Sequence, residues 1–94
     1  MLNENEVKAA LKNFLVETLG VEAELITDDV FLFGDGDIGL GSIDALEIIA
    51  FADSEYGVSM TGVAREVFAT VNSITAFIME NYGLNQETAA DEID

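Results

Sequence analysis

The fold of this chain depends on Gly39-Leu40-Gly41-Ser42-Ile43-Asp44-Ala45-Leu46-Glu47-Ile48-Ile49, a segment that starts as a loop and continues as a helix. Its glycines allow the backbone angles that a loop needs, and apolar side chains then recur at helical spacing. Ser42 is placed to cap the helix, because its hydroxyl could accept a hydrogen bond from a first-turn N–H while Asp44 complements the positive helix end. We predict a helix from about Ser42 to Tyr56, ended by Gly57.

A wheel of this predicted helix, drawn at about 100° per residue, has apolar residues on both of its faces. The face expected to pack in the core consists of Ala45, Ile48, Ile49, Ala52 and Tyr56. The opposite face mixes the polar residues Asp44, Glu47, Asp53 and Ser54 with the apolar residues Ile43, Leu46, Ala50 and Phe51. Exposed apolar side chains ringed by charge of one sign are typical of a docking surface, since burial supplies affinity and charge selects partners.

The docking surface predicted from this wheel has an apolar centre and an acidic rim. Its residues are Ile43, Asp44, Leu46, Glu47, Ala50 and Asp53, with Glu55 as a further acidic neighbour. The hydroxyl of Ser42 would lie at the head of this surface.

The chain resembles the acyl carrier proteins of fatty-acid and polyketide synthesis from about Val7 to Tyr82. The resemblance is carried by GLGSIDALEII, by Asp53-Ser54-Glu55-Tyr56-Gly57, by Arg65-Glu66-Val67-Phe68 and by Val71-Asn72-Ser73-Ile74. In that family the serine at this position carries covalent 4′-phosphopantetheine, so the resemblance implies that Ser42 is the attachment site. It also implies a phosphopantetheinyl transferase and acyl-loading and condensing enzymes as partners.

One residue departs from the family pattern. The family usually has Asp immediately before the serine, where its carboxylate would face basic groups on the transferase, and this chain has Gly41. A glycine there is also found in peptidyl carriers, although their pair of adjacent glycines followed by His or Asp is absent. A peptidyl or aminoacyl carrier therefore stays open as an alternative, as does an unmodified acidic adaptor that docks through the same helix.

The charge of the chain limits its partners. It has 94 residues, enough for one domain, with 3 basic and 19 acidic residues and a formal net charge of −16. Such a charge repels phosphate backbones and anionic lipid, which argues against nucleic-acid and membrane-surface binding. It favours partner enzymes with basic patches, whose association should weaken as salt screens the charges.

The chain contains no Cys and no His, so a catalytic triad, an imidazole metal ligand and a thiol of its own are all excluded. A serine hydrolase is also disfavoured because Leu40 stands where the G-x-S-x-G motif requires Gly. We expect a carrier rather than an enzyme. The stretch Gly34–Gly39 resembles a calcium loop only weakly, since Leu40 occupies the glycine position and Leu46 the final ligand position, so no metal site is predicted.

The remaining elements follow from caps and stops. Asn3 with Glu6 resembles a capping box, and Gly20 suits a helix end. Lys8 is spaced for an ion pair with Glu4. The first predicted helix is Glu4–Leu19, and its core face consists of Val7, Ala10, Leu11, Phe14, Leu15 and Thr18. A long loop follows at Val21–Gly41; we expect its apolar residues to tie it to the bundle, with a helical turn near Thr27–Val30. After the helix at Ser42–Tyr56 we predict a short helix at Ala64–Ala69, with Val67 and Phe68 as core or channel residues, and a last helix at Ser73–Tyr82, capped by Asn72 or Ser73 and stopped by Gly83.

These elements predict an all-α fold: a four-helix bundle of acyl-carrier type, with three longer helices, one short helix and a long first loop. Residues 1–84 would form the domain, and residues 85–94 a disordered acidic tail. The N-terminus lacks the features of a signal peptide and no apolar run is long enough to span a membrane, so a cytoplasmic monomer is expected. The sequence leaves the pathway and the cargo open.

Overall fold

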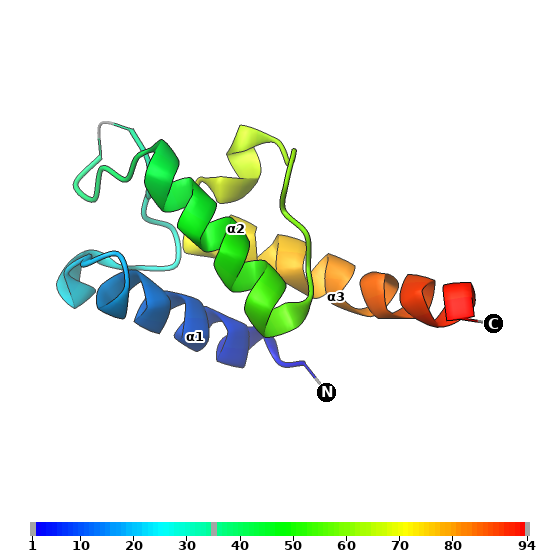
Figure 1. Cartoon of the computed structure of the whole chain (residues 1–94). Helices are drawn as coiled ribbons and strands as arrows, with labels where there is room; N and C mark the ends of the chain where they lie inside the picture. Colours follow the sequence, from blue (N-terminus) through cyan, green and yellow to red (C-terminus); the bar gives the residue numbers. More distant parts are fainter. Residues whose placement is uncertain (1, 35, 94) are drawn as a thin grey trace.

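The computed structural model describes residues 2–34 and 36–93, with side chains described as far as Tyr82. The α-helices are α1 (Glu4–Glu17), α2 (Ser42–Tyr56) and α3 (Val71–Ile93), and the 3-10 helices are η1 (Ala23–Leu25) and η2 (Arg65–Phe68) (Figure 1). Within the described residues the extended structure is limited to an isolated bridge between Phe33 and Leu40. The all-α fold is confirmed, and the predicted short helix is a 3-10 turn.

The first helix starts where its cap predicts. The side chain of Asn3 accepts hydrogen bonds from the backbone N–H groups of Asn5 at 2.8 Å and Glu6 at 3.4 Å. The helix ends at Glu17, two residues before the predicted end, and Gly20 adopts a left-handed conformation with φ of 73°. The chain therefore turns sharply into the long loop at a position where only glycine is unstrained.

The core is formed by one face of each α-helix. Its fully buried helical residues include Val7, Leu11 and Leu15 of α1, Ile48 and Ala52 of α2, and Val71, Ile74 and Ile78 of α3. Helix α1 packs against α3, and α2 lies across them (Figure 1). Each buried Val, Leu or Ile side chain among them contributes about 1.5–3 kcal/mol through its burial. The core face predicted for α1 is confirmed at these positions, whereas Thr18 is exposed.

Phe51 was assigned to the exposed face of α2, and this prediction was wrong. Its ring stacks on Phe14 of α1 with centroids 4.7 Å apart, and it makes an edge contact with Tyr56 at 5.9 Å. Phe51 lies three residues after Ile48, which places it about 60° away on the wheel, at the margin of the buried arc. A large aromatic ring at that margin can still reach the neighbouring helix, and its burial outweighs the position that the wheel assigned.

The long loop is tied to the bundle by backbone hydrogen bonds. The N–H of Leu32 donates to the carbonyl of Ala69 at 2.8 Å, and the N–H of Leu40 donates to the carbonyl of Leu32 at 2.8 Å. Leu32 is fully buried, so the prediction that apolar residues tie this loop down is confirmed. At the predicted helical turn near Thr27–Val30 the structure has a single hydrogen-bonded turn, in which the N–H of Val30 donates to the carbonyl of Thr27 at 3.5 Å, and the 3-10 helix of the loop is η1.

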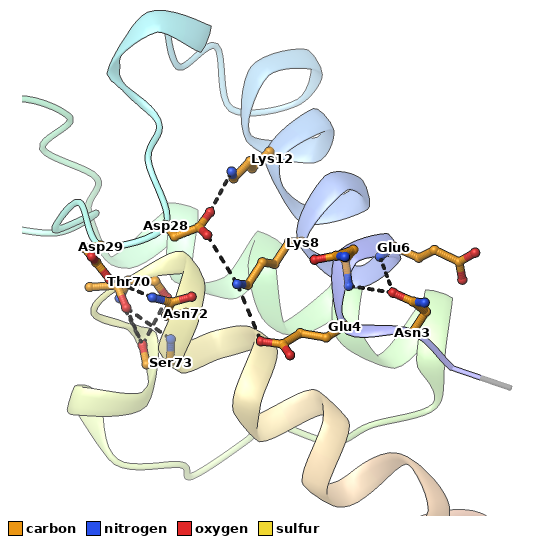
Figure 2. Close-up of polar contacts among 11 residues, drawn as sticks. Asn3, Glu4, Glu6, Lys8, Lys12, Asp28, Asp29, Thr70, Asn72 and Ser73 are labelled. Atoms are coloured by element: carbon orange, nitrogen blue, oxygen red, sulfur yellow. Dashed lines mark hydrogen bonds and ion pairs between the residues drawn. The ribbon is translucent and has the colours of Figure 1, made fainter.

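Side chains attach the same loop to α1 and α3 (Figure 2). The carboxylate of Asp28 lies 3.2 Å from Lys8 Nζ and 2.7 Å from Lys12 Nζ. These contacts, Lys12 first, lower the pKa of Asp28, while Asp28 raises the pKa of Lys8. Asn72 of α3 completes the attachment, since its side-chain Nδ2 donates to Asp29 Oδ1 at 2.6 Å and its backbone N–H donates to the carbonyl of Asp28 at 3.0 Å. The predicted pair between Lys8 and Glu4 is also present, at 3.5 Å.

The last helix begins two residues before its predicted start. Thr70 caps it: the Thr70 hydroxyl accepts from the N–H of Ser73 at 3.0 Å, and the Ser73 hydroxyl accepts from the N–H of Thr70 at 3.0 Å. The predicted stop at Gly83 was wrong, because α3 continues to Ile93 and extends beyond the other helices (Figure 1). Glycine costs a helix interior only about 1 kcal/mol, which does not force an end.

The division into a domain of residues 1–84 and a disordered tail of residues 85–94 stays a prediction. Asp94 of that tail, and Asp35 of the weak calcium-loop match, lie outside the described residues. No helix in the described part of the chain is long and apolar enough to cross a membrane.

Candidate functional site

Ser42 is the first residue of α2 and not its cap, which corrects the prediction. The N-cap is Gly41, whose N–H donates to Asp44 Oδ2 at 2.9 Å and whose carbonyl accepts from the N–H of Ala45 at 3.1 Å. Asp44 therefore caps the helix by accepting from Gly41, whereas Ser42 was expected to accept from a first-turn N–H. The Ser42 side chain is exposed, and among the described residues its hydroxyl has no hydrogen-bond partner. This hydroxyl is available for modification.

Gly41 has room for a larger side chain. Its backbone is extended, with φ of −119° and ψ of −171°, and a Cβ added there would meet no atom of the described residues within 4 Å. Packing within this chain therefore does not require glycine before Ser42. The acyl carrier resemblance leads us to expect an Asp at this position. The packing of the described residues does not explain why this chain has Gly41 there.

A groove of about 820 Å³ lies directly beside Ser42. Its walls come from the long loop, the start of α2 and η2, and they include Phe31, Leu40, Ser42, Val63, Arg65 and Phe68. Phe68 thus belongs both to the core and to the groove wall. Val67, which was predicted with it as a core or channel residue, is half-buried against the core. The groove could hold a flexible, mostly apolar group attached to Ser42.

The exposure predicted for the outer face of α2 is confirmed at its apolar centre. Ile43 is 75% exposed and Leu46 is 64% exposed. Ala50, Glu47 and Asp53 are also exposed, whereas Asp44 is half-buried beside the helix start. The structure therefore brings the predicted docking residues to one surface that begins at Ser42. Their role in docking stays a prediction.

Two residues beside Ser42 were missed by sequence reasoning. Phe31 is 65% exposed in the long loop, and Arg65 opens η2; both line the groove. An apolar run in a loop was a signal for Phe31, although it suggested anchoring rather than exposure. Arg65 belongs to one of the stretches that resemble acyl carrier proteins, and the signal for its role was the rarity of a basic residue in so acidic a chain.

Comparison with known proteins places these features in a family. No family model matches the chain. Acyl carrier proteins of Bradyrhizobium sp. strain ORS 278, Nitrobacter hamburgensis and Rhodopseudomonas palustris are each 31% identical to it over 77 residues, which cover 82% of this chain and 95% of each relative. The similarity spans nearly the full length of these relatives and most of the bundle described above. The chain therefore belongs to the acyl carrier protein family.

Proposed function

We propose that this chain carries acyl intermediates as thioesters on a 4′-phosphopantetheine arm attached to Ser42, and delivers them to partner enzymes of fatty-acid or polyketide-type synthesis. The observation that carries the proposal is the exposed hydroxyl of Ser42, without a hydrogen-bond partner among the described residues, beside a groove of about 820 Å³. The curated relatives support a carrier role, since they are named acyl carrier proteins.

The attachment of the arm would use Ser42 as the nucleophile. Its Oγ would attack the β-phosphate of coenzyme A, forming one P–O bond while the P–O bond to 3′,5′-ADP breaks. The hydroxyl proton would pass to a base of a separate transferase, which also supplies Mg²⁺, because this chain contains no His and no Cys. The proposal therefore makes the chain a substrate of an enzyme rather than an enzyme.

The start of α2 suits the product of that reaction. The first N–H groups of a helix have no intrahelical partner, and the helix dipole makes this end positive. An anionic phosphodiester on Ser42 would lie close to those donors, which is a favourable place for it. When attached, the arm supplies the thiol that the Cys-free chain lacks. The groove walls contributed by Phe31, Val63 and Phe68 offer apolar surface to a group held there.

The outer face of α2 is proposed to dock the partner enzymes. Ile43, Leu46 and Ala50 would form the apolar centre of contact, and the acidic residues beside them would attract basic patches on the transferase and on acyl-loading and condensing enzymes. A small docking surface on a chain with a net charge of −16 favours rapid and weak association, and its affinity should fall as ionic strength rises. A cytoplasmic monomer is part of the same proposal.

Intact-mass spectrometry tests the proposal. The purified chain is incubated with coenzyme A, Mg²⁺ and a phosphopantetheinyl transferase of broad specificity, and we expect the mass of one phosphopantetheinyl group to be added. Ser42→Ala should gain nothing, whereas Ser54→Ala, which removes an exposed serine farther along α2, should be modified like the wild type. Circular dichroism establishes that both variants are folded.

The opposite result would favour the acidic adaptor. If several transferases add no mass to the folded wild-type chain, while a partner protein is retained equally by the wild type and by Ser42→Ala, docking occurs without an arm. A peptidyl or aminoacyl carrier would gain the arm in the same assay. The group found on protein isolated from its native host, an acyl or an aminoacyl thioester, separates that alternative from the proposed acyl carrier.

A further inference from the structure

Arg65 differs from the other basic residues of the chain in what surrounds it. The chain has three basic residues, Lys8, Lys12 and Arg65. Both lysines bind Asp28, on the side of the molecule where α1 meets the long loop (Figure 2). Arg65 is exposed, and among the described residues it forms no ion pair. In a chain with 19 acidic residues, a guanidinium without an acidic partner is an unusual feature.

The position of Arg65 suggests which group its guanidinium could contact. Arg65 and Ser42 line the same groove, Arg65 from η2 and Ser42 from the start of α2. Most of the remaining wall is apolar, with Phe31, Leu40 and Phe68 among its residues. The rest of the molecule is strongly acidic and repels anions. An anionic group that enters this groove from Ser42 would therefore meet a cation there.

Glu66 also lines the groove and carries the opposite charge. Successive side chains in a 3-10 helix point about 120° apart, so Arg65 and Glu66 present their charges in different directions. The two residues make the groove wall polar at separate points. Such a wall favours an anion beside Arg65 and disfavours one beside Glu66, which would orient a tethered group as well as hold it.

We propose that Arg65 binds an anionic oxygen of the group tethered at Ser42. This inference rests on the proposed function. A guanidinium is suited to the role because its planar set of donors can contact two oxygens of a phosphate or a carboxylate at once. The anion has two possible sources, the phosphodiester of the arm itself and a carboxylate on the cargo. In the second case Arg65 would select dicarboxylic acyl groups over purely aliphatic ones.

The chain offers a direct probe, because Arg65 is its sole arginine. Its side-chain Nε–Hε group therefore gives one assignable resonance in protein labelled with ¹⁵N-arginine. That resonance is compared in the full-length chain without the arm, with the arm, and with butyryl or malonyl cargo. A shift on addition of the arm indicates the phosphodiester, and a shift between butyryl and malonyl cargo indicates the carboxylate. A resonance at one position in all four forms would overturn the proposal.

Variants give a second measurement that does not use the arginine signal. If the carboxylate is the ligand, Arg65 should lower the pKa of a ¹³C-labelled malonyl carboxyl by about 0.2–0.7 relative to Arg65→Gln, as an exposed ion pair would. If the phosphodiester is the ligand, its ³¹P resonance should differ between the same two proteins. Glu80→Gln is the charge control, because it removes one exposed acidic side chain of α3 that does not line the groove and should leave the Arg65 contact in place.

The outcomes separate this inference from the function on which it rests. A folded chain that gains no phosphopantetheinyl mass overturns both. A chain that gains the mass, and in which neither the Arg65 resonance nor the carboxyl and phosphorus signals depend on Arg65, overturns only the role of Arg65. The second result would also follow if Arg65 contacted partner enzymes alone, since the measurements use the isolated carrier.

Discussion

The buried hydroxyl of Thr75 allows a direct test of the packing of the core. Its side chain is 0% exposed within α3, and among the described residues its hydroxyl oxygen has no hydrogen-bond partner. Val differs from Thr by a methyl group in place of that hydroxyl, and both residues are β-branched with similar helix propensity. Thr75→Val therefore removes an unsatisfied polar atom with little change in shape or backbone preference.

The expected gain follows from the cost of the buried hydroxyl. Burying a hydroxyl without a hydrogen bond costs about 1–3 kcal/mol in proteins. We expect Thr75→Val to recover the lower part of that range, about 1–2 kcal/mol of unfolding free energy, because the new methyl group must still fit the packed site. For a domain of this size each kcal/mol corresponds to a rise in Tm of about 4–8 °C.

Urea and thermal denaturation followed by circular dichroism measure this change, with two controls. Thr75→Ser keeps the hydroxyl and loses the methyl group, so it should lower stability by about 1 kcal/mol. Val71→Thr adds a hydroxyl at another fully buried position of the same helix, and should lower stability by about 1–3 kcal/mol. A Thr75→Val protein less stable than the wild type would refute the reasoning, since it would mean that the hydroxyl makes a stabilising bond, for instance to a carbonyl one turn earlier.

Two further predictions concern the attached loop and the two faces of α2. The Lys12 and Lys8 contacts lower the pKa of Asp28 from 3.8, and Asp28 raises that of Lys8 from 10.5. Urea denaturation across pH measures the difference in unfolding free energy between the wild type and Asp28→Asn. This difference should be constant near neutrality, shrink as pH falls below about 4 and shrink again as pH rises above about 10.5. The same difference at every pH from about 2 to about 12 would contradict this prediction. In α2, replacing the buried Ile48 by Ala should lower the unfolding free energy by about 2–5 kcal/mol, whereas Ile43→Ala on the exposed face should change it by less than about 0.5 kcal/mol. Thermal denaturation measures both changes. Equal losses in the two variants would show that the two faces are misassigned.

Capping residues and glycines predicted the start of α1 and both ends of α2. The Asn3 cap predicts the start of α1, and the start and end of α2 agree with the prediction from Ser42 and Gly57. The end of α3 was missed because a single glycine is a weak stop signal when its neighbours can continue the helix. The start of α3 was missed because Thr70 and Ser73 cap each other through a reciprocal pair that does not match the usual motif.

Contacts between distant parts of the chain could not be predicted in the same way. The hydrogen bond from Leu32 to Ala69 and the ion pairs of Asp28 join residues far apart in sequence, and only the packed fold brings them together. The burial of Phe51 depends on Phe14 in another helix for the same reason. The site shows both cases: the exposure of Ile43 followed from periodicity, whereas the groove shared by Ser42 and Arg65 required the arrangement of three separate segments.

The attachment of the long loop bears on the exchange between partner enzymes that the proposed function requires. Backbone hydrogen bonds hold the loop at Leu32, Leu40 and Asp28, and Leu40 lies two residues before Ser42. Binding of a partner at this end of the molecule would therefore cost these attached residues little conformational entropy. Under the proposed function, the residues held by these bonds would not have to be rebuilt between one partner enzyme and the next.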